Sequence, residues 1–425
     1  MAKIVRVWAR EILDSRGKPT VEAACQADTG HITVASVPSG PSAATHEALE
    51  IRDNDQKRFR GLGVTKAVDN VNKILGPKIV GQDPTRQADI DSIMIREDGT
   101  ENKSKLGANA ILSVSEAVSK LGAIVQGKSL YTWIMETAVQ RGLNVQLKMP
   151  IPIMNMINGG LHGAGNLDFQ EFWVVPASSK SFHQGLRIAA EIYMAVGENL
   201  ERKNAIHSVG DEGGYAPNLF TNADAFEVLL ESIRESGYSL GRDVFFGLDV
   251  AASVFFKNGE YVIRDKTSPL DDNALMEFYK DLNSNYHLAM LEDPFHDEAW
   301  DSWKKITTVM GNQVLIIGDD LLSTNPKRLA KAIKEAACNT ILVKPNQIGT
   351  VTETLDIIKM ARNANWNVIV SHRSGETNDW FIADFAVGAG ANYVKFGAPA
   401  RGERVAKYNR LLSVEKELLP DSNNE

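Results

Sequence analysis

The sequence predicts an α/β protein in which an N-terminal α+β domain precedes an eight-stranded barrel. Short apolar runs recur along the second half of the chain, and each stops at a charged or polar residue before a helix-like segment begins. Such a run is typical of a parallel strand buried on both faces. The first part of the chain instead alternates Val-, Ile- and Thr-rich stretches with turn residues, as antiparallel strands do. Its 425 residues suffice for a barrel of about 250 residues and a smaller domain.

The N-terminal domain is predicted over residues 1–142. Strands are expected from Ile4 to Leu13, Thr20 to Ala27 and His31 to Val37, with a turn at Asp28-Thr-Gly30. This order predicts a three-stranded antiparallel meander. The chain then becomes helical, most clearly over 108–125, where it is apolar on most sides and therefore expected to be packed on most sides.

The segment 37–45 (Val-Pro-Ser-Gly-Pro-Ser-Ala-Ala-Thr) interrupts this pattern. It has little apolar surface to bury and it offers hydroxyl groups, so it fits a mobile surface loop with a function. A plain connector has the same composition, and from composition alone it is the simpler interpretation.

The barrel is predicted over residues 143–425. Strands are expected over 151–157 and 169–175, and the glycine-rich connection between them has no room for a helix. Helices over 182–203 and 223–236 follow. Six further strands are predicted to end near Asp249, Glu292, Asp319, Lys344, His372 and Lys395. Two strands, two helices and six strand-helix units make an eight-stranded barrel. The residues at the ends of these six strands are expected to share one rim of it.

Composition limits the class of protein. The net charge of −8, with 43% hydrophobic and 24% charged residues, is ordinary for a globular chain and argues against a general nucleic-acid binder. Cys25 and Cys338 lie far apart in the chain, so neither a disulfide framework nor a cysteine-rich zinc site is expected. Charges interrupt the N-terminal segment and no run reaches membrane-spanning length, so we expect a cytoplasmic protein without a membrane partner.

Three acids suggest a metal site. Asp249, Glu292 and Asp319 end strands of the same barrel, so their carboxylates are expected to converge, and like charges in one place need a cation. Ligation by oxygen alone suits magnesium. Taken singly, each acid fits a helix cap equally well. Asp293 and Asp320 should point away from the strand ends and support the first three residues.

Basic groups end the next strands. Lys344 is a candidate base, because a lysine beside a divalent cation and away from water has its neutral form favoured. His372, Arg373 and Ser374 follow, and an arginine with a hydroxyl at a helix start fits an anion such as phosphate. Lys395 adds a further positive charge, although a salt bridge to a surface acid is its ordinary alternative.

Other polar residues fit the same rim. Glu212 lies in a glycine-flanked turn, where a carboxyl group can serve as general acid. Gln170 and Glu171 are expected within a buried strand, where a charge without a function would be destabilising. His162, in a glycine-rich loop, fits either a substrate contact or a turn cap.

These residues lie in segments that resemble the enolase family. The resemblance runs from residue 4 to about 418. Its specific segments are Asp14-Ser-Arg-Gly-Lys-Pro-Thr20, Thr100-Glu-Asn-Lys-Ser-Lys-Leu-Gly-Ala-Asn-Ala-Ile-Leu112, Asp168-Phe-Gln-Glu-Phe172, Gly210-Asp-Glu-Gly-Gly214, Leu291-Glu-Asp-Pro294, Lys344-Pro-Asn-Gln-Ile-Gly-Thr350, Ser371-His-Arg-Ser-Gly-Glu-Thr377 and Ala398-Pro-Ala-Arg401. It implies an enolase-type β2α2(βα)6 barrel and a homodimer or larger ring.

The resemblance also implies roles. Asp249, Glu292 and Asp319 would bind one Mg²⁺, and Ser42 would reach a second when its loop closes. Lys344 would accept a proton and Glu212 would donate one. The residues expected around a small phosphorylated hydroxy acid are His162, Gln170, Glu171, Lys344, His372, Arg373, Ser374 and Lys395. The reaction implied is the reversible dehydration of 2-phospho-D-glycerate to phosphoenolpyruvate in glycolysis and gluconeogenesis.

The chain departs from the family near the expected substrate. It reads Ser39-Gly-Pro-Ser-Ala-Ala44, where most members read Ser-Gly-Ala-Ser-Thr-Gly, so Pro41, Ala43 and Ala44 are unusual. Trp380 and Phe396 stand where small residues are common. An enolase-like dehydratase for a related substrate, such as carboxyphosphonoenolpyruvate synthase, is therefore the alternative. A non-catalytic role, such as a lens-type structural protein or a surface binder of plasminogen, is a third hypothesis, but it predicts changed residues at the catalytic positions, and none is seen there.

Overall fold

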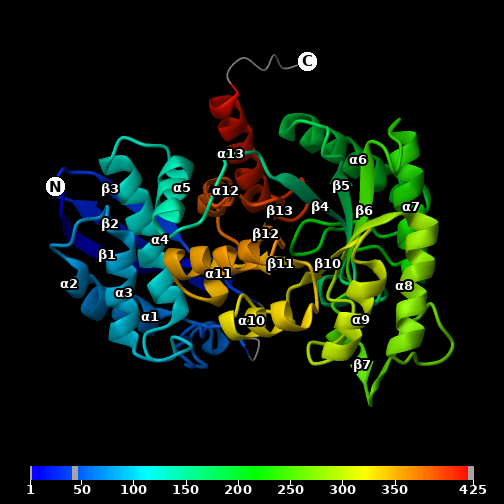
Figure 1. The fold of residues 1–425 in the computed structure, drawn as a ribbon, viewed down its shortest axis with the longest axis horizontal. Coiled ribbons are helices and arrows are strands. Elements are labelled where there is room, and N and C mark those ends of the chain that lie inside the picture. The colour runs from blue at the N-terminus through cyan, green and yellow to red at the C-terminus, as the bar shows by residue number, and fades with distance from the viewer. Residues whose placement is uncertain (1, 41–45, 164, 420–425) are drawn as a thin grey trace.

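The computed structural model describes residues 2–40, 46–163 and 165–419, and it contains two domains side by side (Figure 1). A three-stranded antiparallel sheet begins the chain, in the order β1-β2-β3. Its strands are β1 (Ile4–Leu13), β2 (Pro19–Ala27) and β3 (Ile32–Ser36). The predicted meander is confirmed, and its strand ends differ from the prediction by one residue at most.

Helices cover this sheet. They are α1 (Thr65–Asn70), α2 (Gly76–Ile79), α3 (Gln87–Asp98), α4 (Ala108–Val125) and α5 (Leu130–Gln140), with a 3-10 turn at Phe59–Gly61 and a π-helical turn at Val71–Leu75. Within the described residues, α4 alone is long and apolar enough to cross a membrane, and 83% of it is buried inside the structure. It packs on β2, β3, α3 and α5, so the protein itself covers the apolar sides of this helix.

The second domain is a closed eight-stranded barrel, which confirms the predicted fold. Its strands are β4 (Ile151–Asn158), β5 (Glu171–Pro176), β6 (Val244–Asp249), β9 (Leu288–Glu292), β10 (Leu315–Gly318), β11 (Thr340–Val343), β12 (Asn367–Ser371) and β13 (Tyr393–Lys395). Around the barrel they follow the order β10-β11-β12-β13-β4-β5-β6-β9. Only the pairs that include β5 are antiparallel, and all other pairs are parallel.

The reversed direction of β5 places its start at the rim where the other strands end. Glu171, the first residue of β5, pairs with Asp249 in the sheet, and Asp249 pairs with Glu292. Gln170 precedes the strand, so the expectation that it lies within one is wrong. Glu171 is 1% exposed and reaches the rim because its strand enters there.

Helices form the outer layer of the barrel (Figure 1). They are α6 (Phe182–Arg202), α7 (Asn222–Glu235), α8 (Asp272–Tyr286), α9 (Trp300–Met310), α10 (Pro326–Glu335), α11 (Val351–Asn363), α12 (Phe381–Gly388) and α13 (Gly402–Leu418). Ser181 and Gln184 form a capping box at the start of α6, and Asn325 caps α10. A small hairpin of β7 (Phe256–Lys257) and β8 (Glu260–Tyr261) precedes α8 and was not predicted from the sequence.

Apolar side chains fill the barrel interior below the rim. They are Ile153, Trp173, Val175, Met290, Ile317, Leu342 and Ile369. Along each strand, inward-facing and outward-facing side chains alternate. The inward-facing residue that lies two positions closer to the rim therefore projects into the space above this apolar layer. The rim residues therefore stand on an apolar floor, which keeps water away from their lower side.

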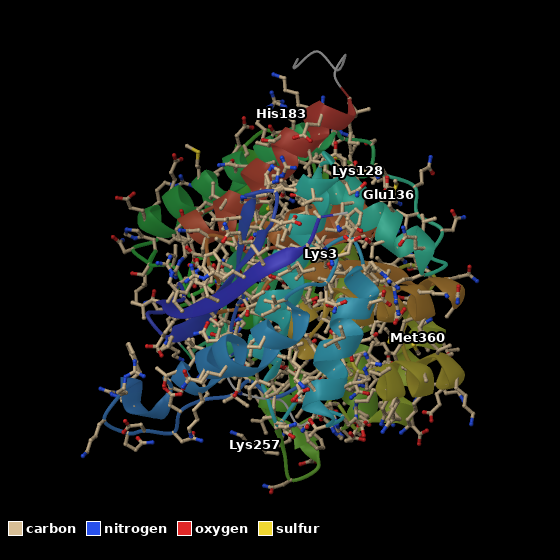
Figure 2. The ribbon with its side chains drawn as sticks, turned by 90° about the vertical axis from the view of Figure 1, so that its left-hand side faces the viewer. Lys3, Lys128, Glu136, His183, Lys257 and Met360 are labelled. Atoms are coloured by element: carbon tan, nitrogen blue, oxygen red, sulfur yellow. The ribbon has the colours of Figure 1, made fainter. Side chains whose placement is uncertain are left out.

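The two domains share a buried joint. Asp91 of α3 accepts hydrogen bonds from the Thr352 backbone N–H at 3.1 Å and from the Ser115 hydroxyl at 2.8 Å. Burial raises the pKa of Asp91 to about 6, against the effect of these bonds. Figure 2 shows Met360 of α11 beside the N-terminal domain. The predicted boundary at residue 142 falls in the segment between α5 and β4, and it remains a prediction.

Asp91→Ala is expected to lower the free energy of unfolding by about 3 kcal/mol, because it leaves buried donors on Ser115 and Thr352 without an acceptor. Urea denaturation measures this change. Asp89→Ala on the same helix is the matched control, because the Asp89 side chain is 51% exposed, and it should change stability by less than about 0.5 kcal/mol. Equal losses in the two variants would contradict the role of Asp91 in the joint.

Candidate active site

The predicted residues gather at one end of the barrel around a cavity of approximately 450 Å³. The predicted site residues that line it are His162, Gln170, Glu171, Glu212, Asp249, Asp319, Lys344, His372, Arg373, Ser374 and Lys395. Glu292 is fully buried and contacts Lys395. Ser42, Pro41, Ala43 and Ala44 lie outside the described residues.

Lys395 joins the acids of neighbouring strands. Its Nζ lies 2.8 Å from Glu292 Oε1, 3.1 Å from Asp249 Oδ2 and 3.5 Å from Glu171 Oε1. Gln170 Nε2 also donates to Asp249 Oδ2, at 3.1 Å. Burial alone would lower the pKa of Lys395, but the carboxylates around it raise that pKa well above its usual value. Lys395 is therefore a buried ammonium ion, and the alternative of a surface salt bridge does not apply.

A second group of acids surrounds Asp319. The carboxylates of Asp293, Asp319 and Asp320 lie within 4.8 Å of one another. Asp293 accepts the backbone N–H groups of Asp319 at 3.0 Å and Asp320 at 2.7 Å, so it holds the chain that carries Asp319. This supporting contact agrees with the interpretation of Asp293 from the sequence.

The acids fit a cation. Burial and the nearby Asp249 carboxylate raise the pKa of Glu292 well above its usual value. Glu292 Oε2 and Asp319 Oδ1 are buried and make no hydrogen bond within the described part of the chain. Buried carboxylate oxygens without donors are unfavourable unless a cation binds them. The residues present therefore suit magnesium, with oxygen ligands from Asp249, Glu292 and Asp319.

Lys344 forms an ion pair with Asp319, and this contact affects its protonation state. Its Nζ donates to Asp319 Oδ2. Burial would lower the pKa of Lys344, but the Asp319 carboxylate raises it, and the net shift is upward. The Asp319 carboxylate thus stabilises the ammonium form of Lys344, and the expectation of a neutral amine beside a bound cation stays a prediction. A cation on Asp319 would remove that stabilisation.

A cluster of carboxyl and imidazole groups faces the lysines. His162 Nδ1 lies 3.5 Å from Glu171 Oε1 and 3.6 Å from Glu212 Oε2, and His372 Nε2 lies 3.5 Å from Glu212 Oε2. The Ser374 hydroxyl donates to Glu212 Oε1 at 3.0 Å. Segments far apart in the chain thus bring these five side chains together.

The charges in this cluster are unequal. Burial and the charge of Glu212 raise the pKa of Glu171 to about 7. Burial would also raise the pKa of Glu212, but the imidazoles of His162 and His372 hold it well below its usual range. Burial would lower the pKa of His162, but the carboxylates of Glu212 and Glu171 raise it to about 9. Near neutral pH, the two carboxyl groups of Glu171 and Glu212 can therefore bind one proton as a pair, and this proton is not assigned to Glu212 alone.

Arg373 is held by the N-terminal domain. Its guanidinium contacts Glu47 with NH1–Oε2 at 3.0 Å and NH2–Oε1 at 3.2 Å, and it also donates to Asn346 Oδ1 at 2.9 Å. A Cβ on Gly40 would lie 2.2 Å from Arg373 NH2, so only glycine permits this approach. Arg373 is thus fixed as a buried cation at the junction of the domains, where an anion can bind it.

Sequence reasoning missed Glu47 and the residues that hold it. Gln347 Nε2 donates to Glu47 Oε1 at 3.1 Å, and Thr324 Oγ1 donates to Gln347 Oε1 at 2.6 Å. The same Thr324 oxygen accepts from the Lys344 backbone N–H at 3.0 Å. A chain of hydrogen bonds thus connects Lys344 to Arg373. Glu47 follows the segment 37–45, which was predicted to be a surface loop with a function, and this position was the indication in the sequence that Glu47 could lie near the site.

Two departures from the family lie outside the cavity. Phe396 is fully buried in the barrel core, with its ring 6.0 Å from that of Tyr408. Trp380 lies in a separate groove, where the Lys120 ammonium is 5.4 Å and the Arg410 guanidinium 5.0 Å from its ring. Neither side chain lines the candidate site, so neither changes its contacts directly.

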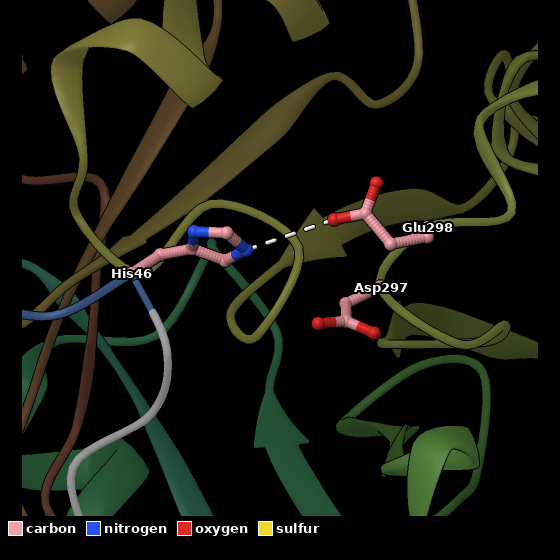
Figure 3. A group of neighbouring side chains, drawn as sticks. All are labelled: His46, Asp297 and Glu298. Carbon is pink, nitrogen blue, oxygen red and sulfur yellow. Dashed lines mark ion pairs between the residues drawn. The ribbon is translucent and has the colours of Figure 1, made fainter.

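His46 and Asp297 line the cavity and Glu298 lies beside them, with the His46 ring pointing toward Glu298 at 3.6 Å (Figure 3). Arg328 NH1 lies 2.9 Å from His46 Nε2 and 2.7 Å from Glu298 Oε1. The guanidinium therefore supplies the positive charge in this group. It connects the chain at residue 46 to the barrel.

The fold and site together define a barrel protein of the enzyme type, in which acids, lysines and a buried arginine meet at one rim of the barrel. Comparison with protein families agrees. Residues 4–134 match the enolase N-terminal domain, and residues 146–424 match the enolase C-terminal TIM barrel domain. The chain belongs to the enolase family.

Mg²⁺ is expected to raise the melting temperature of chelator-treated protein by roughly 3 °C at about 100 times its dissociation constant, because it binds only the folded site. Glu292→Gln should remove most of this rise, since it replaces a buried carboxylate ligand. Glu277→Gln is the control, with its side chain 66% exposed on α8, and it should keep the full rise. Differential scanning calorimetry measures the shifts, and a full rise in Glu292→Gln would contradict the assignment of Glu292.

Proposed function

We propose that this chain is a phosphopyruvate hydratase, a hydro-lyase that reversibly dehydrates 2-phospho-D-glycerate to phosphoenolpyruvate in glycolysis and gluconeogenesis. The observation that carries the proposal is the meeting, in one cavity, of Lys344, the Glu171–Glu212 pair and the anchored Arg373. These groups supply a base, an acid and a phosphate site. Membership of the enolase family supports the reaction type.

Lys344 is the proposed base. Once neutral, its Nζ accepts the proton from the carbon next to the substrate carboxylate, and the electron pair moves into that carboxylate. Asp249, Glu292 and Asp319 would hold one Mg²⁺, and Ser42, outside the described residues, would hold a second, so that the ions would supply positive charge to offset the charge on that carboxylate. Lys395, a buried ammonium ion beside the same acids, adds positive charge on the same side.

The Glu171–Glu212 pair is the proposed acid. The C–O bond to the substrate hydroxyl breaks, and the leaving hydroxide takes the proton of the pair to become water. Glu212 is the proposed donor to the leaving group, and Glu171 and His162 keep the shared proton available. Gln170 and His372 hold Asp249 and Glu212 in place, respectively.

Arg373 and Ser374 are proposed to bind the phosphate. The guanidinium is oriented by Glu47 and Asn346, and a dianionic phosphate competes well with a single carboxylate for its N–H groups. Phe396 and Trp380 lie outside the cavity, so the phosphonate alternative rests on the departures at Pro41, Ala43 and Ala44.

We further propose a cytoplasmic homodimer. Both cysteines are buried free thiols, which suits a reducing compartment. A groove of approximately 820 Å³ beside the N-terminal sheet includes Leu13, Ile32 and Trp380, which are 57%, 51% and 39% exposed. Exposed apolar surface of this kind is typical of protein interfaces.

Wild-type protein is expected to convert 2-phosphoglycerate to a product that absorbs as an enol phosphate, and a chelator should abolish the conversion. Lys344→Ala should lower turnover about 10³-fold, because the base is lost, while keeping the Mg²⁺-dependent rise in melting temperature. Lys331→Ala, an exposed lysine on α10, is the control and should turn over normally. Folded wild-type protein that binds Mg²⁺ without activity would contradict this substrate and favour the phosphonate alternative.

Sedimentation equilibrium is expected to give twice the chain mass of 46.6 kDa. The double substitution Leu13→Asp with Ile32→Asp should give monomers, because it places charges on the apolar face that we propose to be buried. Phe220→Asp is the control, with Phe220 85% exposed and outside the groove. An unchanged mass in the double variant would contradict an interface at this face.

A further inference from the structure

Trp173 forms the top of the apolar floor under the site. It lies on β5, is fully buried and points into the barrel interior. Its indole Nε1–H donates to Glu171 Oε2 at 2.8 Å, and Lys395 Nζ lies 4.5 Å from its ring centroid. One apolar side chain thus contacts both an acid and a lysine of the candidate site.

The neighbouring strand leaves room for this ring. A Cβ on Gly247 of β6 would lie 2.7 Å from Trp173 Cε3, which is closer than side-chain atoms approach. The glycine therefore leaves space for the Cε3 edge of the indole beside β6. Close packing on this side restricts the ring to the orientation in which its N–H reaches Glu171.

The bond to the indole determines the direction of the Glu171 carboxyl group. With Oε2 held from below, Oε1 faces His162 and Lys395, each at 3.5 Å. Without the indole N–H, Oε2 would be a buried acceptor without a donor, and the carboxyl group would be free to rotate.

The ring also limits the position of Lys395. Carboxylates contact the ammonium from the rim side, and the face of the indole contacts it from below. Attraction between a cation and an aromatic face is strongest where the cation is desolvated, and Lys395 is only 4% exposed. The ammonium group of Lys395 therefore lies between the carboxylates of Asp249 and Glu292 and the electron-rich face of the indole.

We propose that Trp173 is a positioning residue that orients Glu171 through its N–H and supports Lys395 with its ring, and that it senses a cation at Asp249 and Glu292. The catalytic part of this inference rests on the proposed function. The sensing part rests on geometry alone, because a cation on Asp249 and Glu292 shares these two carboxylates with Lys395 and weakens their attraction for its ammonium ion. The charge above the indole then changes, and so does its fluorescence.

Two substitutions separate the two contacts. Trp173→Phe keeps a ring under Lys395 but removes the N–H, and Trp173→Leu removes both. Trp303→Phe is the matched control, because Trp303 is also fully buried and its Nε1–H also donates, to the His296 carbonyl at 3.2 Å. It lies on α9, outside the candidate site.

Turnover of 2-phosphoglycerate should fall about tenfold in Trp173→Phe and a further threefold to tenfold, roughly, in Trp173→Leu. KM should change by less than about threefold, because Arg373 and Ser374 are untouched. Trp303→Phe should lose a similar amount of thermal stability to Trp173→Phe without losing turnover. A purely structural role predicts equal turnover per folded molecule in all these proteins at 25 °C.

Tryptophan emission on addition of Mg²⁺ provides the second measurement, and it needs no substrate. The emission should change in wild-type protein and in Trp303→Phe and stay constant in Trp173→Phe. Wild-type protein that responds to Mg²⁺ but does not turn over 2-phosphoglycerate would overturn the proposed function and support the sensing role. An unchanged wild-type emission, the same response in Trp173→Phe, or a folded Trp173→Phe variant with wild-type turnover would each overturn the proposal for Trp173.

Discussion

Buried negative charge at one end of the barrel is the constraint on which the site depends. Asp249, Glu292 and Asp319 lie almost out of reach of water, where like charges repel strongly. Lys395 and Lys344 come from other strands and offset part of this repulsion. The arrangement requires the observed strand order and register, since a slip of one residue would turn an acid toward the outer helices. The apolar interior adds to the constraint, because it keeps water from screening the charges.

The N-terminal domain contributes to the site as well as to the fold. Glu47 of this domain orients Arg373 of the barrel, and Gln347 and Thr324 connect that contact to the backbone at Lys344. Asp91 joins the domains at the start of α11, the helix that follows Lys344 in the chain. The position of Arg373 relative to Lys344 is therefore set jointly by the two domains. Neither domain alone holds the complete arrangement.

The elements of the fold that could be predicted were those with a local signal. The apolar runs that end at Asp249, Glu292 and Lys395 are strands, and α4 has the bounds expected from its apolar pattern. The two-residue strands β7 and β8 are too short to produce a pattern. Within the site, residue types at strand ends indicated which groups meet, but not their pairing. The contact of Glu47 with Arg373 and the raised pKa of Lys344 depend on distances between remote segments, which no local pattern contains.

The antiparallel direction of β5 affects how the loops around such a site can change in length during evolution. In a regular barrel, each strand delivers one loop to the active end, and a helix always lies between that loop and the next strand. Here the connection from Asn158 to Glu171 leaves the active end and returns to it directly. Both of its anchors are fixed by the sheet, and the backbone N–H groups of Asp168 and Phe169 donate to Asn222 at the start of α7, so changes of loop length before Asp168 can reshape access to the cavity while this link to the outer layer is kept. A change of length in this part of the hairpin would therefore alter selectivity while the strand-helix units of the barrel stay in place.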